Sequence, residues 1–168
     1  MPVLAIAIVG MAACVFDVRT QRIPNALTFS AAVAAIAFHA ATAGWVGVGF
    51  SVSGWFVGTL LFFPFFALRG MGAGDVKLLA AFGAWLGPRD VFYVAAATAI
   101  LGAVFALAMI VARHRTQKTF THMSAMLSSW TIDGVRAVPG LTLAEPSRLA
   151  MCYSLPITAG ALVTIWLG

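Results

Sequence analysis

Two aspartates stand out among the few charged residues of this chain. Asp17 ends an apolar run and Asp75 precedes another, and each is followed two positions later by a cation, Arg19 and Lys77 respectively. A carboxylate beside membrane-like sequence is costly unless it lines a cavity or pathway, so such residues usually serve a function. Two carboxylates that come close together share a proton, because both cannot readily ionise.

Such a pair has the chemistry to hydrolyse a peptide bond. The ionised acid takes a proton from the attacking water, while the protonated acid hydrogen-bonds the carbonyl oxygen of the substrate. This reaction needs no metal, and His39, His114 and His122 lie too far apart in the sequence to suggest a metal-ligand set. We therefore expect Asp17 and Asp75 to be catalytic, with no cofactor and no metal.

The composition requires a lipid environment for these acids. Of the 168 residues, 62% are hydrophobic and 9% are charged, and the mean hydropathy is +1.00. A soluble domain carries about 45–50% apolar and about 25% charged residues, so this chain lacks the polar surface of a soluble protein. The cations are scattered at the ends of apolar runs, which favours lipid headgroups over nucleic acid as the partner.

The apolar runs predict an all-α, polytopic integral membrane protein, folded as a single membrane-embedded domain over residues 1–168. We expect a bundle of six transmembrane helices, formed by the runs Val3–Phe16, Ala26–Ala43, Val46–Leu68, Val76–Leu86, Val91–Ala112 and Leu149–Leu167. No basic residue precedes the first run, so we interpret it as a retained span and not as a signal peptide. The first and fourth runs are short, which draws the acids at their ends toward the membrane boundary.

The basic residues orient these spans. Of the ten Lys and Arg residues, all but Arg89 lie in or beside the connections between spans one and two, three and four, and five and six. Because cytoplasmic loops carry an excess of cations, we expect these connections on the cytoplasmic side of the inner membrane and both termini outside. Asp17 and Asp75 then share one side and one depth.

Apolar residues recur at helical spacing in the longest connection, residues 113–148: Phe120, Met123, Leu127 and Trp130. This pattern predicts either a short helix in the cytoplasmic interface between spans five and six, or a packed lid over the neighbouring loops.

Three glycines, Gly70, Gly72 and Gly74, precede Asp75. Glycine permits backbone conformations and close approaches that other residues forbid, so a substrate backbone or a neighbouring helix could come up to this acid. The simpler interpretation is structural, since Asp75 stands where a helix N-cap belongs. The presence of Asp17 at the same depth favours a function for both acids.

Two blocks of sequence resemble the signatures of the type IV prepilin leader peptidases, which are GxGD membrane aspartyl proteases. Residues 72–78 (GAGDVKL) are similar to the G-x-G-D-x-K-L motif, and residues 17–25 (DVRTQRIPN) are similar to the first catalytic segment. The blocks follow spans one and three, as in that family. Residues 153–157 (YSLPI), in the last span, are a weaker match.

The resemblance implies a membrane aspartyl endopeptidase with Asp17 and Asp75 as its catalytic pair. It also assigns substrate approach and motif support to Gly72, Gly74, Lys77, Pro24 and Asn25. The implied substrate is a prepilin with a short basic leader and an apolar helix, cut at the cytoplasmic face.

The chain resembles the compact members of this family. Larger members carry a cytoplasmic insertion with paired C-x-x-C motifs and methylate the new N-terminus, whereas residues 18–25 leave no room for that insertion and no C-x-x-C occurs. We therefore expect no methyltransferase activity. The compact form is similar to peptidases of tight-adherence (Flp-type) pili, which we favour, or to archaeal preflagellin peptidases.

Two other function classes remain open at the level of sequence. A proton- or cation-coupled transporter could use the same acids as a relay, although the chain shows no repeated halves. An inactive assembly protein of a pilus or secretion machine is the second alternative. The sequence makes no prediction of the oligomeric state.

Overall fold

The computed structural model describes residues 2–68, 71–112 and 153–167. These residues form four helices: α1 (Pro2–Thr20), α2 (Asn25–Ala67), α3 (Ala73–Ala112) and α5 (Ser154–Leu167). The prediction of an all-α protein is confirmed for this part of the chain. The expected interfacial helix between spans five and six lies outside the described residues.

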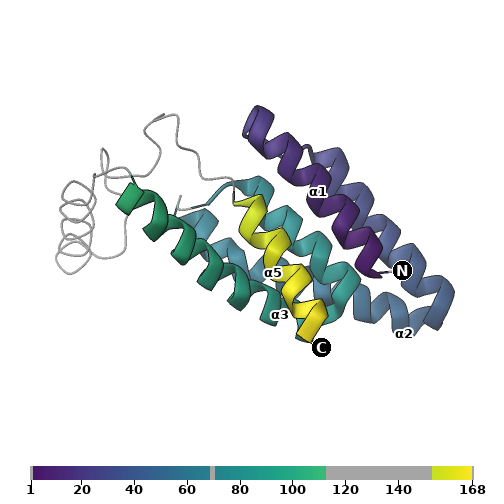
Figure 1. Cartoon of the computed structure of the whole chain (residues 1–168). Coiled ribbons are helices and arrows are strands. Elements are labelled where there is room, and N and C mark those ends of the chain that lie inside the picture. The colour runs from purple at the N-terminus through teal and green to yellow at the C-terminus, as the bar shows by residue number, and fades with distance from the viewer. Residues whose placement is uncertain (1, 69–70, 113–152, 168) are drawn as a thin grey trace.

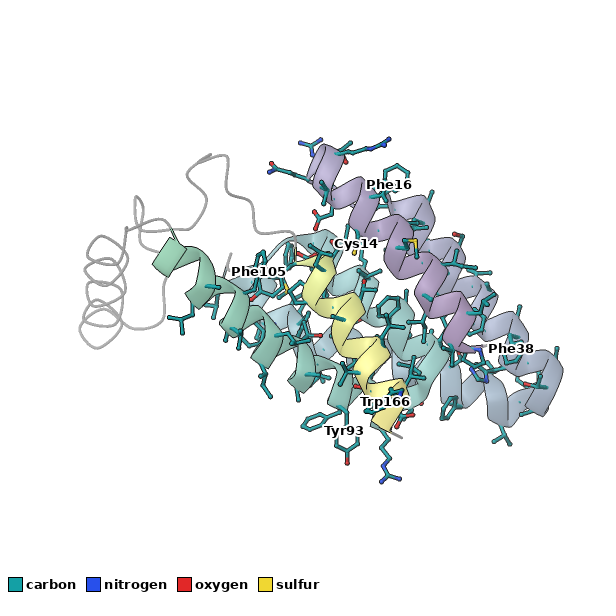
Figure 2. All side chains as sticks on the ribbon, in the orientation of Figure 1. Cys14, Phe16, Phe38, Tyr93, Phe105 and Trp166 are labelled. Carbon is teal, nitrogen blue, oxygen red and sulfur yellow. The ribbon has the colours of Figure 1, made fainter. Side chains whose placement is uncertain are left out.

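The described helices have the length and surface of a membrane protein. Three candidate spans occur, Pro2–Thr20, Asn25–Ala67 and Ala73–Phe105, and α5 is a shorter apolar helix. Large apolar side chains cover the outside of the bundle, which suits lipid and not water. Tyr93 and Trp166 project outward near the end that carries the C-terminus (Figure 2), as aromatic side chains do at a membrane–water interface. Six crossings remain a prediction.

A glycine interrupts each of the two long helices. Gly44 in α2 has φ 59° and ψ −141°, and Gly87 in α3 has φ 84° and ψ 175°. These backbone conformations are open mainly to glycine. The ribbons of α2 and α3 each turn back on themselves (Figure 1), and Gly47 lies directly against the carbonyl of His39, a contact that a continuous helix cannot make. Both α2 and α3 therefore consist of two antiparallel segments.

Helix α3 is the centre of the bundle. It packs along α2 on one side and along α5 on the other, while α1 packs mainly on α5 (Figure 1). The backbones of α2 and α3 touch at Gly54 and Gly83, each of which lies against the carbonyl of the other. Such close contact between small residues is a common way to pack membrane helices. Three large side chains from the first half of α3 are completely buried: Leu78, Leu79 and Phe82.

The candidate catalytic residues lie at one end of the bundle. Asp17 contacts Ser154, and Gly10 packs against Thr158, so α1 and α5 run antiparallel. The last turn of α1 therefore lies beside the first turn of α5. The N- and C-termini lie together at the opposite end (Figure 1).

Helices α1 and α3 extend beyond the apolar runs that predicted them. Helix α3 begins at Ala73, and the amide of Asp75 donates a 3.2 Å hydrogen bond to the carbonyl of Gly72. Asp75 therefore lies inside the first turn, and its interpretation as an N-cap is wrong. The apolar run marks where the side chains become hydrophobic, whereas the helix begins where the backbone hydrogen bonds begin.

Candidate active site

Asp17 is a buried carboxylate near the end of α1. Only 9% of the residue is exposed. Its Oδ2 atom accepts one hydrogen bond from the hydroxyl of Ser154, at 2.7 Å, and one from the amide of Ser154, at 3.3 Å. The first amides of a helix lack partners within that helix and attract negative charge. Asp17 thus caps the N-terminus of α5 from a neighbouring helix, which compensates for its burial.

Asp75 lies half-buried in the first turn of α3. A Cβ atom placed on Gly72 would be 3.2 Å from the Oδ2 atom of Asp75, so this glycine lies directly against the carboxylate. The carboxyl groups of Asp17 and Asp75 lie within electrostatic reach of each other. The structure therefore brings together the two acids that the sequence marked, at the end where α1, α3 and α5 meet.

The residue before α5, Tyr153, also faces this region. Its phenol lies within electrostatic reach of Asp75. The ring also packs on Gly102 of α3, where an added Cβ would be 3.2 Å from the phenolic oxygen. Two consecutive residues thus approach the two acids. Tyr153, just before α5, lies near Asp75, and Ser154, the first residue of α5, contacts Asp17.

The glycines of the GAGD segment have different surroundings. Gly72 faces the Asp75 carboxylate, whereas a Cβ on Gly74 would lie 3.1 Å from the Cβ of Ile23. The space left by Gly74 is thus taken by a buried side chain from the segment between α1 and α2. The contribution of these glycines to substrate approach remains a prediction.

The two sequence blocks are joined by a side-chain hydrogen bond. The Nζ atom of Lys77 donates to the Oδ1 atom of Asn25 at 2.8 Å, which links the N-terminal ends of α2 and α3. Pro24 precedes α2 with φ −60° and ψ 133°, the extended conformation that its ring favours. Its carbonyl accepts the amide of Leu27 at 3.1 Å and so starts the helix.

Sequence reasoning missed the contribution of the start of α5. The YSLPI segment resembles the family signature, but nothing in the sequence indicates that Ser154 reaches Asp17. The described ranges contain no group of three or more His, Cys, Asp or Glu residues that could hold a metal ion.

The described residues form an all-helical bundle with helices long and apolar enough to span a membrane and a pair of acids at one end. Residues 4–107 match the model of the type IV leader peptidase family. The chain therefore belongs to the type IV leader peptidase family, as its two sequence blocks predicted. The matched residues contain Asp17 and Asp75, while α5 lies beyond them.

Two similar proteins, both from Aeromonas salmonicida, are described as prepilin leader peptidase/N-methyltransferase. Each is 34% identical to this chain over 108 residues, which cover 60% of this chain and 37% of the relative. The chain thus matches well under half the length of these relatives. No solved structure shows a significant match.

Proposed function

We propose that this chain is a membrane aspartyl endopeptidase that removes the leader peptide from type IV prepilins of the Flp-like type at the cytoplasmic face. One observation carries the proposal: in a member of the leader peptidase family, Asp17 from α1 and Asp75 from α3 lie within electrostatic reach of each other. The two acids come from separate helices, so their meeting is a product of the fold.

The two carboxyl groups share the work of hydrolysis. One, in its ionised form, accepts a proton from a water molecule as the water oxygen attacks the scissile carbonyl. The other, in its protonated form, donates a hydrogen bond and then its proton to the carbonyl oxygen. When the tetrahedral intermediate collapses, the C–N bond breaks and the leaving amine takes a proton from the acid that received one from water. The other acid, now ionised, takes back a proton from a hydroxyl group of the intermediate as the product carboxyl group forms.

The substrate we propose is a prepilin with a short basic leader followed by an apolar helix. The apolar outer surface of the bundle is compatible with a substrate helix that lies beside it in the bilayer. The acids lie at one end of that surface, so they would meet the chain where the substrate helix ends and its polar leader begins.

We further propose that the chain has six crossings in the inner membrane, with the acid end in the cytoplasm and both termini outside. The reversals at Gly44 and Gly87 divide the two long helices into crossings of opposite direction. The exposed cations Arg19 and Arg22 lie near Asp17, whereas Arg89 follows the turn at the other end. This distribution agrees with the positive-inside rule.

Methyltransferase activity is not part of the proposal, although the printed names of the two relatives include it. Helix α1 ends at Thr20 and α2 begins at Asn25, and this short link has no space for an insertion with paired cysteines. The mass of the mature pilin made by this chain tests the point directly, and a methylated N-terminus would contradict it.

Cleavage of a co-expressed prepilin tests the proposed function. We expect Asp17→Asn and Asp75→Asn each to lower the rate of leader removal by about 10²–10⁴-fold, because Asn keeps the size of the side chain but cannot transfer the proton. Asp90→Asn, in the turn after Gly87 at the opposite end, is the matched control and should cleave normally. Undiminished cleavage by Asp17→Asn or Asp75→Asn, when the variant is correctly inserted in the membrane, contradicts the mechanism.

The choice of substrate separates the two compact subgroups. We expect the chain to process a prepilin of the Flp type, and an archaeal preflagellin serves as the comparison substrate. Efficient cleavage of the preflagellin alone would contradict the Flp-like assignment and leave the aspartyl mechanism intact.

A further inference from the structure

We propose that Ser154 is a positioning residue that sets the orientation of the Asp17 carboxylate for catalysis. The inference rests on the proposed function, because it assigns a task to a residue that serves the same acid pair. Ser154 belongs to the weaker YSLPI match, but it lies outside the two stronger sequence blocks and outside the matched residues 4–107.

The hydroxyl of Ser154 donates its hydrogen bond to Asp17. The residue is completely buried, and a buried hydroxyl needs a hydrogen-bond partner. Other buried or half-buried hydroxyls in α3 and α5 bond to the carbonyl four residues earlier in their own helix, as Thr98, Thr158 and Thr164 do. Ser154 instead donates to a carboxylate 137 positions away in the sequence.

Two donors from one residue fix the direction of the carboxylate. The hydroxyl and the amide of Ser154 both point at Oδ2 of Asp17, at 2.7 Å and 3.3 Å. Two hydrogen bonds from one residue to one oxygen restrict the rotation of the carboxylate. A catalytic group has to be held within about 0.5 Å of its productive position.

The packing of α5 on α1 makes this clamp rigid. Gly10 lies so close to the side chain of Thr158 that a larger residue at position 10 would force a shift of that side chain or of the helix. The Sγ atom of Cys14 lies 3.6 Å from Oγ1 of the same threonine. These contacts favour one register of α5 along α1, and in that register the start of α5 lies against Asp17.

The start of α5 also lies between the helices that carry the two acids and contacts both of them. Tyr153 lies within electrostatic reach of Asp75 and packs on Gly102 of α3. The turn that begins α5 therefore contacts the helices that carry both acids, and Ser154 holds Asp17 on that turn. We infer that α5 fixes the placement of Asp17 relative to Asp75.

Steady-state kinetics of the purified full chain with a prepilin substrate test the inference. We expect Ser154→Ala to lower kcat by about 10- to 100-fold with little change in KM, since misplacing a reacting group by about 1 Å can cost ~100-fold. Ser154→Thr keeps a hydroxyl at the same position and should recover most of kcat. Ser154→Cys keeps the volume but offers only a weak donor, so its kcat should fall while its melting temperature stays close to that of the parent.

Ser51→Ala is the matched control. Ser51 is also completely buried, and its hydroxyl donates to the carbonyl of Ala84 at 2.8 Å, away from the acids. If burial alone matters, Ser51→Ala and Ser154→Ala should lower stability and kcat alike. The inference expects loss of kcat only at Ser154.

The outcomes separate this inference from the proposed function. A wild-type kcat in folded Ser154→Ala or Ser154→Cys overturns the positioning role. If Ser154→Ala does not fold, the kcat values of Ser154→Cys and Ser154→Thr test the role instead. An active Asp17→Asn variant overturns the proposed mechanism itself. An inactive Asp17→Asn variant beside a fully active Ser154→Cys variant overturns the inference alone.

Discussion

At the scale of single residues, the site is shaped by what stands next to each acid. Asp17 has Ser154 as its hydrogen-bond donor, whereas Asp75 has the bare backbone of Gly72 beside its carboxylate. The absent side chain of Gly72 leaves room at the acid. At Gly74 the space that a side chain would take is occupied by Ile23. Gly74 therefore allows α3 to pack closely on the segment before α2.

Substitution of Gly72 tests this difference. The Cβ of Gly72→Ala would be 3.2 Å from Oδ2 of Asp75, so the carboxylate has to shift by a few tenths of an ångström. We expect kcat for leader removal to fall about tenfold, because small displacements of a reacting group are costly, with little loss of stability at this exposed position. Gly49→Ala is the control, since no atom lies within 4 Å of its Cβ position. Full activity of Gly72→Ala would show that Asp75 does not need this space.

The acids could be predicted from the sequence, but the serine could not. Asp17 and Asp75 are conspicuous because few charged residues occur and these two abut apolar runs. Ser154 has a common side chain, and its importance depends on a partner 137 positions away. Only the packing of α5 on α1 reveals that pairing.

At the scale of elements, two glycines allow long apolar segments to fold back on themselves. The breaks between predicted runs fall at Gly44 and Gly87, so the sequence located both turns. The two turns differ in their surroundings. Nothing lies within 4 Å of the Cβ position of Gly44, whereas that of Gly87 is occupied by the ring of Phe50.

These surroundings predict unequal effects on stability. Gly44→Ala should lower the free energy of unfolding by about 1–3 kcal/mol, because alanine is strained at this positive φ. Gly87→Ala carries a comparable strain and also displaces Phe50, so its loss should be larger. Thermal unfolding of the purified protein in detergent measures both variants. An effect at Gly87 equal to or smaller than that at Gly44 would contradict the packing described for the turn.

The helix ends were less predictable than the turns. Apolar runs located the buried parts of α1 and α3, but both helices continue into polar sequence, where Asp17 and Asp75 lie. Hydropathy reports where side chains meet lipid, and backbone hydrogen bonding extends past that limit. For this reason Asp75 is a first-turn residue and not a cap.

At the scale of the whole molecule, the arrangement of the helices places the chemistry at one end. The charge pattern predicted that the connections after spans one and three share a side, and the structure brings Asn25 and Lys77 into contact there. The sequence could not give the lateral placement of the acids. That placement depends on how α5 packs on α1 and α3, which no periodicity within a single helix encodes.

A cysteine crosslink between positions 17 and 75 tests most directly whether the two acids form one site. In a chain that carries Cys14→Ser and Cys152→Ser, the pair Asp17→Cys and Asp75→Cys should form an intramolecular link with a short thiol-reactive crosslinker in native membranes, because the two carboxyl groups lie within electrostatic reach. The pair Asp17→Cys and Asp90→Cys should not link, because Asp90 follows the Gly87 turn at the opposite end. Linkage only in the first pair is the expected result; no link between positions 17 and 75, or equal linkage in both pairs, would contradict a shared site.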